Sequence, residues 1–321
     1  HLTVTSPAAT GSVRAVRDLS FQLAQGEILA LVGETGCGKS TVALSIQGLI
    51  PDRKFVERGT IGFEGRELEP ADGKGWEELR GRKIGMVFQD ARGSLNPVLT
   101  IGHHLIESLR AHQRLSRKDA RNQAAGLLAE VGFPEPEFNM RRYPFELSGG
   151  MCQRVGIALG ICNQPRLLIA DEPTCALDPT IQAQILDLLK QLNRRYGLAL
   201  LLITHDLTLV PEIAQRIAVM YCGRLVESGR ASEVLRKPAH PYTRALLESL
   251  PDWNHRIDQR PLAGIPGAPP APGEDLTGCA FAPRCIRAQP ECRSSIPDAV
   301  EISDSWWTAC IMVERQPCSQ Y

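Results

Sequence analysis

Three glycines, a lysine and three hydroxyl residues lie together in the stretch "GETGCGKST", which follows the apolar run "EILALV". The spacing Gly33-x4-Gly38-Lys39-Ser40 suits a loop whose backbone N–H groups converge on phosphate oxygens at the start of a helix. Lys39 can then reach the β and γ phosphates of a nucleotide, and Ser40 can bind Mg²⁺. A glycine-rich turn could match by chance, but the predicted strand before it and helix after it favour a phosphate site. The candidate residues are Gly33, Glu34, Gly36, Cys37, Gly38, Lys39, Ser40 and Thr41.

Two carboxylates close the apolar run in "RLLIADEP". Asp171, at the carboxyl end of this predicted strand, is suited to hold Mg²⁺ through water, and Glu172 is suited to polarise an attacking water. Acidic pairs are common at loop starts. Downstream of a phosphate loop, however, such a pair favours nucleotide hydrolysis.

A second candidate anion site lies in "LSGGMCQR". Ser148, Gly149 and Gly150 can form another helix start that binds phosphate. Two phosphate-binding surfaces in one chain suggest head-to-tail dimers, with nucleotide held between the loop of one chain and the serine–glycine turn of the other.

The elements that must position these residues alternate between strand and helix. Strands are predicted for "RAVRDLSFQL", "GEILALVG" and "KIGMVFQD", and an antiparallel hairpin for "GTIGFEGREL". Helical spacing covers 101–159, and the buried strands "RLLIAD" and "LALLLIT" are followed by helices predicted over 180–196 and 207–218. We therefore predict an α/β fold with a mostly parallel central sheet, an antiparallel β flap and a helical subdomain.

Composition excludes several classes of protein. Lys+Arg and Asp+Glu both number 36, so the formal charge is zero and a globally basic nucleic-acid binder is not indicated. Apolar runs are shorter than the roughly 20 residues that cross a bilayer, and the start shows no secretory signal. The first residue is His1, so we expect the natural N-terminus to be missing or altered. We predict a cytosolic protein that reaches a membrane by docking on a partner.

With these motifs in place, the chain resembles the ATP-binding subunit of ABC transporters, a group of P-loop NTPases. "GETGCGKS" and "LLIADEP" are similar to its Walker A and Walker B motifs, and "LSGGMCQR" to its signature. Gln89 in "VFQD" matches the Q-loop, Ala176–Asp178 the D-loop, and His205 in "LLITHD" the switch histidine. All six appear in the family's order across 13–227.

The resemblance implies ATP and Mg²⁺ as cofactors and adds roles for several residues. Gln89 would sense Mg²⁺ and the γ-phosphate, and His205 would contact the γ-phosphate in the transition state. Ser148, Gly149 and Gly150 would act on ATP held by the partner subunit, and Asp178 would lie at the same interface. Closure of the dimer on ATP and its opening after hydrolysis would drive transport.

"QDARGSLNPVLTIG" and "HPYTRALLESLP" narrow the resemblance to the oligopeptide and dipeptide permease branch, which also includes nickel and opine importers. This branch implies an ATPase for di- or oligopeptide import at the cytoplasmic face of the membrane. Implied partners are two membrane permeases, a solute-binding protein and a second ATPase, with a heterodimer favoured over a homodimer. Import of nickel, a metallophore or an opine remains an alternative. Action on DNA or ribosomes is less favoured, because the chain has neither a long coiled coil nor a second cassette. Intact Glu172 and His205 argue against a regulatory subunit that does not hydrolyse ATP.

Four cysteines, Cys279, Cys285, Cys292 and Cys310, follow the extended linker "RPLAGIPGAPPAPGEDLTG", which has five prolines within 261–272, and Cys318 lies beyond them. Four thiolates suit either a [4Fe–4S] cluster or Zn²⁺. The resemblance favours iron–sulfur, because some members of the branch hold such a cluster in a similar tail. Unligated thiols or disulfides are the alternative, and Cys318 is interpreted as a bystander.

The domain division expected from these patterns has three parts. Residues 1–100 and 160–250 form the nucleotide-binding core, 101–159 the helical subdomain, and 251–321 the linker and a loop-rich cysteine extension. One departure from the family lies near the start, where 2–20 contain no aromatic residue to stack on adenine. Val13 or Arg14 could cover the base instead.

Overall fold

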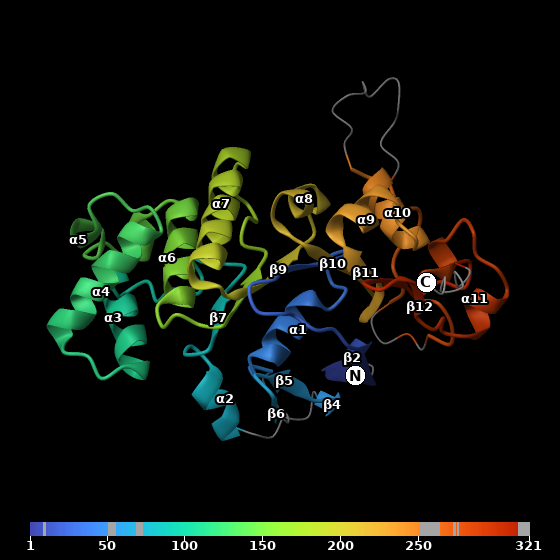
Figure 1. Ribbon diagram of the computed structural model, residues 1–321, viewed down its shortest axis with the longest axis horizontal. Helices are drawn as coiled ribbons and strands as arrows, with labels where there is room; N and C mark the ends of the chain where they lie inside the picture. The colour runs from blue at the N-terminus through green and yellow to red at the C-terminus, as the bar shows by residue number, and fades with distance from the viewer. Residues whose placement is uncertain are drawn as a thin grey trace, which may run out of the picture. The chain divides into compact units, whose positions relative to one another are not determined.

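The computed structural model of the chain describes residues 1–8, 11–50, 56–68, 73–250, 264–271, 274 and 276–313 (Figure 1). Cys318 and parts of the Pro-rich linker, 260–263, 272–273 and 275, lie outside the described residues. The chain divides into two compact units. The first, unit 1, contains 1–22, 29–71 and 204–321, and the second, unit 2, contains 23–28 and 72–203. The predicted three-part division follows other boundaries and stays a prediction.

Antiparallel ribbons begin unit 1. Strand β1 (Leu2–Ala8) pairs with β2 (Gly11–Leu19) and with β4 (Val56–Arg58). The hairpin expected from "GTIGFEGREL" is confirmed as β5 (Ile61–Phe63) and β6 (Arg66–Leu68), with Ile61 opposite Leu68.

The core of unit 1 is built around a five-residue strand, β3 (Ile28–Val32), in which every residue is buried. It pairs in parallel with β10 (Arg216–Tyr221), and β10 pairs antiparallel with β11 (Arg224–Arg230). Before the cysteine extension, the described part of unit 1 has the helices α1 (Lys39–Ile46), α8 (Val210–Ile213), α9 (Ala231–Arg236) and α10 (Pro241–Glu248), with a 3₁₀ turn at Leu207–Leu209. Residues of β10, β11, α9 and α10 share one apolar cluster with Phe281 from the cysteine extension.

Unit 2 has a parallel sheet of β7 (Ile84–Val87), β8 (Leu167–Asp171) and β9 (Ala199–Thr204), whose last residue falls in unit 1. All residues of β8 and β9 are buried, as continuous apolar runs predict. Its helices are α2 (Gly73–Leu79), α3 (Ile101–His112), α4 (Arg117–Glu130), α5 (Pro136–Asn139), α6 (Gly149–Ile161) and α7 (Pro179–Tyr196), with a 3₁₀ turn at Pro144–Glu146. In Figure 1, α3, α4, α5 and α6 group together as the predicted helical region.

Helix α7 shows how local sequence sets the bounds of an element. Asp178 caps its N-terminus by accepting the N–H of Ile181 at 3.0 Å, and Pro179 occupies the first helical position. Gly197 ends the helix in a left-handed conformation with φ of 58°. These signals agree with the predicted helix over 180–196.

The helix predicted over 207–218 is wrong in its second half. Helix α8 ends at Ile213, and β10 starts at Arg216. The segment "RIAVMY" pairs with strands on both sides, so long-range pairing outweighs the local helical spacing.

Short helices and strands interrupt the loops of the cysteine extension. It forms a 3₁₀ turn at Ala282–Arg284, α11 (Glu291–Ser294), β12 (Val300–Ser303) and β13 (Trp306–Thr308). Strand β13 pairs with β11, and β12 pairs with β13. The extension thus lengthens the sheet of unit 1. Within the described part of the chain, no helix is both long and apolar enough to cross a bilayer.

Candidate functional site

The phosphate loop in unit 1 joins β3 to α1, and its backbone requires glycine at two close approaches. A Cβ on Gly33 would lie 2.1 Å from the carbonyl oxygen of Met220, and a Cβ on Gly38 would lie 2.3 Å from that of Ala15. The φ angles at these glycines are +156° and +109°. Neighbouring strands therefore press directly on the loop, and a side chain at either position would collide with backbone.

The Lys39 ammonium lies inside the curl of this loop. Its Nζ donates to the carbonyl of Gly33 at 2.7 Å and to that of Glu34 at 3.0 Å, and the residue is 5% exposed. Helix α1 begins at Lys39, with Ser40 and Thr41 in its first turn. Gly38 at the N-cap offers no side chain to compete for the helix N–H groups, so this end of α1 suits an anion.

Cys37 lies on the inner side of the loop, with its Sγ 3.8 Å from Lys39 Nζ and 6% of the residue exposed. Burial raises the pKa of the Cys37 thiol, and the effect outweighs the opposing field of Lys39. The thiol is therefore neutral at physiological pH, which disfavours its reaction with oxidants or alkylating agents.

In unit 2, the structure brings the Q-loop and Walker B residues into contact. Gln89 Nε2 donates to Glu172 Oε2 at 3.1 Å. The backbone of Glu172 has a φ of +46°, an unusual value for a residue with a side chain, and its N–H donates to Ile203 at 2.9 Å. Asp171, the last residue of β8, is 4% exposed. The oxygens of Gln89, Asp171 and Ser40 are hard donors of the kind that Mg²⁺ prefers.

The signature and D-loop also lie together in unit 2. Ser148 caps α6 by accepting the N–H of Met151 at 3.3 Å. A Cβ on Gly150 would lie 2.8 Å from the side chain of Ile181, in the first turn of the helix that Asp178 caps. Gly149 faces Leu177 of the D-loop, because a Cβ there would lie 3.5 Å from that side chain. The signature helix is thus packed against the D-loop of its own chain.

A further link in unit 2 joins the segment after the Q-loop to the signature. Arg92 Nη2 donates to the carbonyl of Leu147 at 2.5 Å. Leu147 immediately precedes the Ser148 cap, so this hydrogen bond links the segment after the Q-loop to the start of the signature helix. The sequence contained Arg92 in "QDARGS" but offered no signal for this contact.

His205 follows β9 and lies in unit 1, with an exposed side chain. The backbone on either side of it is fixed. The Thr204 hydroxyl accepts the N–H of Asp206 at 3.0 Å, and the Asp206 carboxylate accepts the N–H of Thr208 at 2.9 Å. The strand end and the following 3₁₀ turn therefore present the His205 imidazole from a fixed backbone.

The extension contains one cavity of about 20 Å³ whose lining includes all four candidate cysteines, Cys279, Cys285, Cys292 and Cys310. Cys292 Sγ accepts the N–H of Gln289 at 3.4 Å, and its carbonyl accepts the N–H of Cys279 at 2.7 Å. Burial raises the pKa of the Cys279 and Cys310 thiols.

The same cysteines do not stand in a coordination geometry. Among the described residues, no group of three or more His, Cys, Asp or Glu side chains is arranged to hold a metal ion. All four of these cysteines are free thiols in this structure. Four thiols around one cavity are donors of the type that a thiolate-bound metal needs. The positions of their sulfur atoms in this structure do not form a metal-binding geometry.

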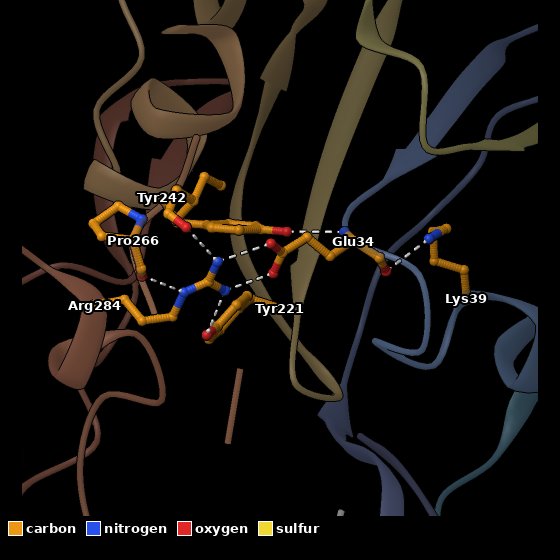
Figure 2. Close-up of polar contacts among 7 residues, drawn as sticks. Glu34, Lys39, Tyr221, Tyr242, Pro266 and Arg284 are labelled. Carbon is orange, nitrogen blue, oxygen red and sulfur yellow. Dashed lines mark hydrogen bonds and ion pairs between the residues drawn. The ribbon is translucent and has the colours of Figure 1, made fainter. Parts of the chain in front are cut away.

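Sequence reasoning missed two residues that contact the phosphate loop from the C-terminal part of unit 1, and a third that contacts one of them (Figure 2). Tyr242 Oη accepts the N–H of Glu34 at 2.9 Å. Arg284 forms an ion pair with the Glu34 carboxylate, and it also donates to Tyr221 Oη. Tyr242 lies in "HPYTR", which carried the family resemblance, and Arg284 lies in "APRC". Neither segment indicated a role at the loop.

Solved structures with a similar fold define the class of protein. The dimeric ATP-binding cassette MJ0796, in a post-hydrolysis state with ADP and Pi, aligns with a TM-score of 0.65 and 28% identity, covering 72% of this chain and 96% of that chain. CbiO1 from Clostridium perfringens, part of the ABC transporter complex cbiONQ, aligns with a TM-score of 0.62 and 28% identity, covering 74% and 90%. The fold is that of an ABC ATPase with a P-loop.

Sequence comparisons reach the same class. Residues 16–175 match the ABC transporter family, and 226–292 match the oligopeptide/dipeptide transporter C-terminal region. The oligopeptide transport ATP-binding protein AppD of Bacillus subtilis is 43% identical over 310 residues, covering 96% of this chain and 94% of the relative. The dipeptide transport ATP-binding protein DppD of Escherichia coli is 44% identical over 299 residues, covering 92% and 90%. The chain belongs to the ATP-binding proteins of ABC transporters and is an ABC-type ATPase.

Proposed function

We propose that this chain hydrolyses ATP to drive the import of di- and oligopeptides. The observation that carries the proposal is the match of 226–292 to the oligopeptide/dipeptide transporter C-terminal region, in addition to the ATPase match. The names of the relatives in Bacillus subtilis and Escherichia coli support the same cargo. Nickel, metallophore or opine import is the second candidate, because those importers belong to the same branch by resemblance.

The proposed roles of the site residues follow the motif geometry. The N–H groups of the phosphate loop, Lys39 and the start of α1 bind the ATP phosphates, while Ser40 and Asp171 provide oxygens for Mg²⁺. Bound Mg²⁺ supplies charge neutralisation at the β and γ phosphates. Glu172 accepts a proton from the attacking water, and His205 contacts the γ-phosphate.

Gln89 acts in this proposal as a sensor of the phosphate. Its side-chain amide donates to Glu172 at 3.1 Å, so the amide can hold the carboxylate before the nucleotide arrives. An amide that turned its oxygen towards Mg²⁺ would release Glu172 towards water. The Arg92 contact with Leu147 supports a route from this rearrangement to the signature.

The signature acts on nucleotide held by another subunit. Ser148, Gly149 and Gly150 meet the γ-phosphate of the partner's ATP, and Asp178 lies at the same interface. We propose a second, related ATPase as that partner, two membrane permeases beneath the pair, and a solute-binding protein that delivers cargo. The chain then works as a peripheral subunit on the cytoplasmic face of the membrane.

An uptake assay tests the proposed cargo. In cells that carry Glu172→Gln in place of the natural chain, uptake of labelled di- and tripeptides should fall to background. Glu137→Gln, at an exposed position of α5, is the matched control and should leave uptake unchanged. Loss of radiolabelled nickel uptake with normal peptide uptake would replace the peptide proposal with the second candidate.

We also propose that Cys279, Cys285, Cys292 and Cys310 bind a metal centre, with a [4Fe–4S] cluster favoured over Zn²⁺ by resemblance. Support comes from the four thiols around one cavity and from the amide N–H that Cys292 Sγ accepts. Analysis of metal content, acid-labile sulfide and visible absorption, on protein purified without oxygen, distinguishes the iron–sulfur cluster from Zn²⁺. Protein that contains neither iron nor zinc would rule out the proposal.

A further inference from the structure

Glu34, the second residue of the phosphate loop, is held by two side chains from the far end of the chain. Arg284 Nη1 donates to its Oε2 at 2.7 Å, and Arg284 Nη2 donates to its Oε1 at 3.0 Å. Tyr242 Oη accepts the backbone N–H of the same glutamate at 2.9 Å. In Figure 2, Tyr242 reaches the loop from α10, and Arg284 reaches it from the cysteine extension.

The pair of Arg284 and Glu34 is largely withdrawn from solvent. The side chain of Arg284 is 4% exposed and that of Glu34 is 27% exposed. The two parallel N–H···O bonds form the fork geometry that suits guanidinium and carboxylate, and partial burial strengthens charge-assisted bonds of this kind. The bonds from Glu34 raise the pKa of the Arg284 guanidinium, so it is charged at any physiological pH.

Arg284 itself is fixed on every side. Its Nε donates to the carbonyl of Pro266 at 3.1 Å, and its Nη1 donates to Tyr221 Oη at 3.2 Å. The guanidinium carbon also lies 5.9 Å from the ring centres of Tyr221 and Phe281. An arginine with this many partners cannot follow Glu34 if the loop moves, so it acts as a fixed anchor.

The anchored glutamate is next to the atoms that hold the phosphate-binding lysine. The carbonyls of Gly33 and Glu34 accept from Lys39 Nζ at 2.7 Å and 3.0 Å. The orientation of these two peptide groups decides where the Lys39 ammonium lies and where the following loop N–H groups point. The Glu34 carboxylate and its N–H, both held from outside the loop, set that orientation.

We propose that Arg284 is a positioning residue for ATP binding, which acts through the Glu34 carboxylate to fix the phosphate loop. The inference rests on the proposed binding of phosphate by the Lys39 loop. On the opposing view, Arg284 only fastens the cysteine extension to unit 1. The two views differ in one measurable respect, because fastening the extension changes stability without changing nucleotide affinity.

The test compares nucleotide binding by Arg284→Gln with that by the wild-type full-length chain. Removing one charged partner should weaken binding of a fluorescent ATP analogue about tenfold, since hydrogen bonds to charged groups have about that effect. The KM for ATP should rise with it, while kcat changes less, because Arg284 does not touch the attacking water. Arg293→Gln, an exposed arginine on the same extension, removes the same charge and should bind as the wild type does.

A double-mutant cycle shows whether Arg284 acts through Glu34. In a Glu34→Gln background, Arg284→Gln should produce little further loss of affinity, because the contact is already weakened. Arg284→Lys keeps the charge but not the fork, so its affinity should lie between wild type and Arg284→Gln. Wild-type affinity in Arg284→Gln, or losses that simply multiply in the double variant, would overturn the proposal.

Two further measurements protect the result from folding defects. Binding is measured well below the melting temperature of each variant, and if Arg284→Gln is not recovered folded, Glu34→Gln alone decides. Glu34→Gln should then bind the analogue about tenfold more weakly, and unchanged affinity would refute the positioning role. Lys39→Ala tests the proposed phosphate site separately. Unchanged binding there would remove that site and the role of Arg284 with it, whereas weakened binding there with wild-type affinity in Arg284→Gln would refute only the positioning role.

Discussion

The motif residues of the two units are held in different ways. In unit 1, the phosphate loop contacts two residues more than 200 positions away in the sequence, through a largely buried ion pair and a tyrosine hydroxyl. In unit 2, Gln89 and Glu172 share one hydrogen bond between side chains that are at least partly open to solvent. Under the proposed function, the difference would separate a binding element that is set before ATP arrives from a contact that is weak enough to change when it does.

This contrast follows the energetics of the contacts. Removing one partner of a forked, largely buried ion pair destabilises a protein strongly, because the other charge is left buried without a partner. A single exposed hydrogen bond contributes about 1 kcal/mol or less. The first arrangement therefore suits a loop that must keep its shape, and the second suits a switch.

The largest expected effect falls on the switch side of the comparison. Glu172→Gln should lower kcat by about 10²- to 10⁴-fold, because an amide cannot accept the proton of the attacking water. ATP binding should persist, and the variant should accumulate as a nucleotide-bound dimer. ATPase assays with size-exclusion chromatography measure both. Wild-type turnover would remove Glu172 from the role of base.

The next prediction uses pH to test the support of Tyr242, one of the two residues that hold Glu34. Burial lowers the pKa of His240 to about 4, and its Nδ1 accepts the N–H of Tyr242 at 3.0 Å. Because the pKa of His240 is lower in the folded state, neutral His240 makes its full contribution to stability above the unfolded pKa near 6.5. This contribution is lost as pH falls towards 4. The loss should reach about 3 kcal/mol of unfolding free energy.

Urea denaturation across this pH window checks that expectation, with His240→Asn as the comparison. Asparagine can also cap Tyr242 but does not titrate, so the unfolding free energy of the variant should fall less steeply with acid. Parallel slopes for the two proteins would show that His240 is not the group responsible.

Within the loop, two glycines separate backbone collision from backbone strain. Gly33→Ala places a Cβ 2.1 Å from the Met220 carbonyl, whereas Gly36→Ala, at φ of +83°, meets nothing within 4 Å. Gly33→Ala should destabilise the protein by about 3 kcal/mol or weaken ATP binding in proportion. Gly36→Ala should cost about 1 kcal/mol. Thermal unfolding and nucleotide titration measure both, and equal effects would contradict the close approach.

The smallest effect sharpens the switch. Gln89→Ala removes one exposed side-chain bond, so the free energy of unfolding should change by less than about 0.5 kcal/mol. If the amide positions Glu172, kcat should nevertheless fall about fivefold. Steady-state kinetics and thermal unfolding give the two values. A large loss of stability would show that Gln89 supports the fold rather than the reaction.

Local signals predicted the motifs and the elements that carry them. The buried run of β8 and the capped helix α7 contain their own start and stop signals, so their bounds agree with expectation. The antiparallel hairpin β5–β6 was predicted for the same reason. Phosphate loops, Walker B residues and signatures are recognisable because their chemistry depends on short spacing.

Features that depend on distant pairing were not predicted. "RIAVMY" forms a strand because β3 and β11 lie beside it, although the preceding residues have helical spacing. The short strands β12 and β13 exist through pairing with β11. The ion pair of Glu34 and Arg284 joins residues 250 positions apart, so the local spacing of residue types cannot predict it.

That separation has a consequence for biosynthesis. A ribosome makes the phosphate loop early and Arg284 only after 250 further residues, so a nascent or truncated chain contains the loop without its anchor. Competence to retain ATP would then mature last, when the cysteine-bearing end has folded back onto the first strands. Cassettes cut short during synthesis or by proteolysis would be poor competitors for the cell's nucleotide.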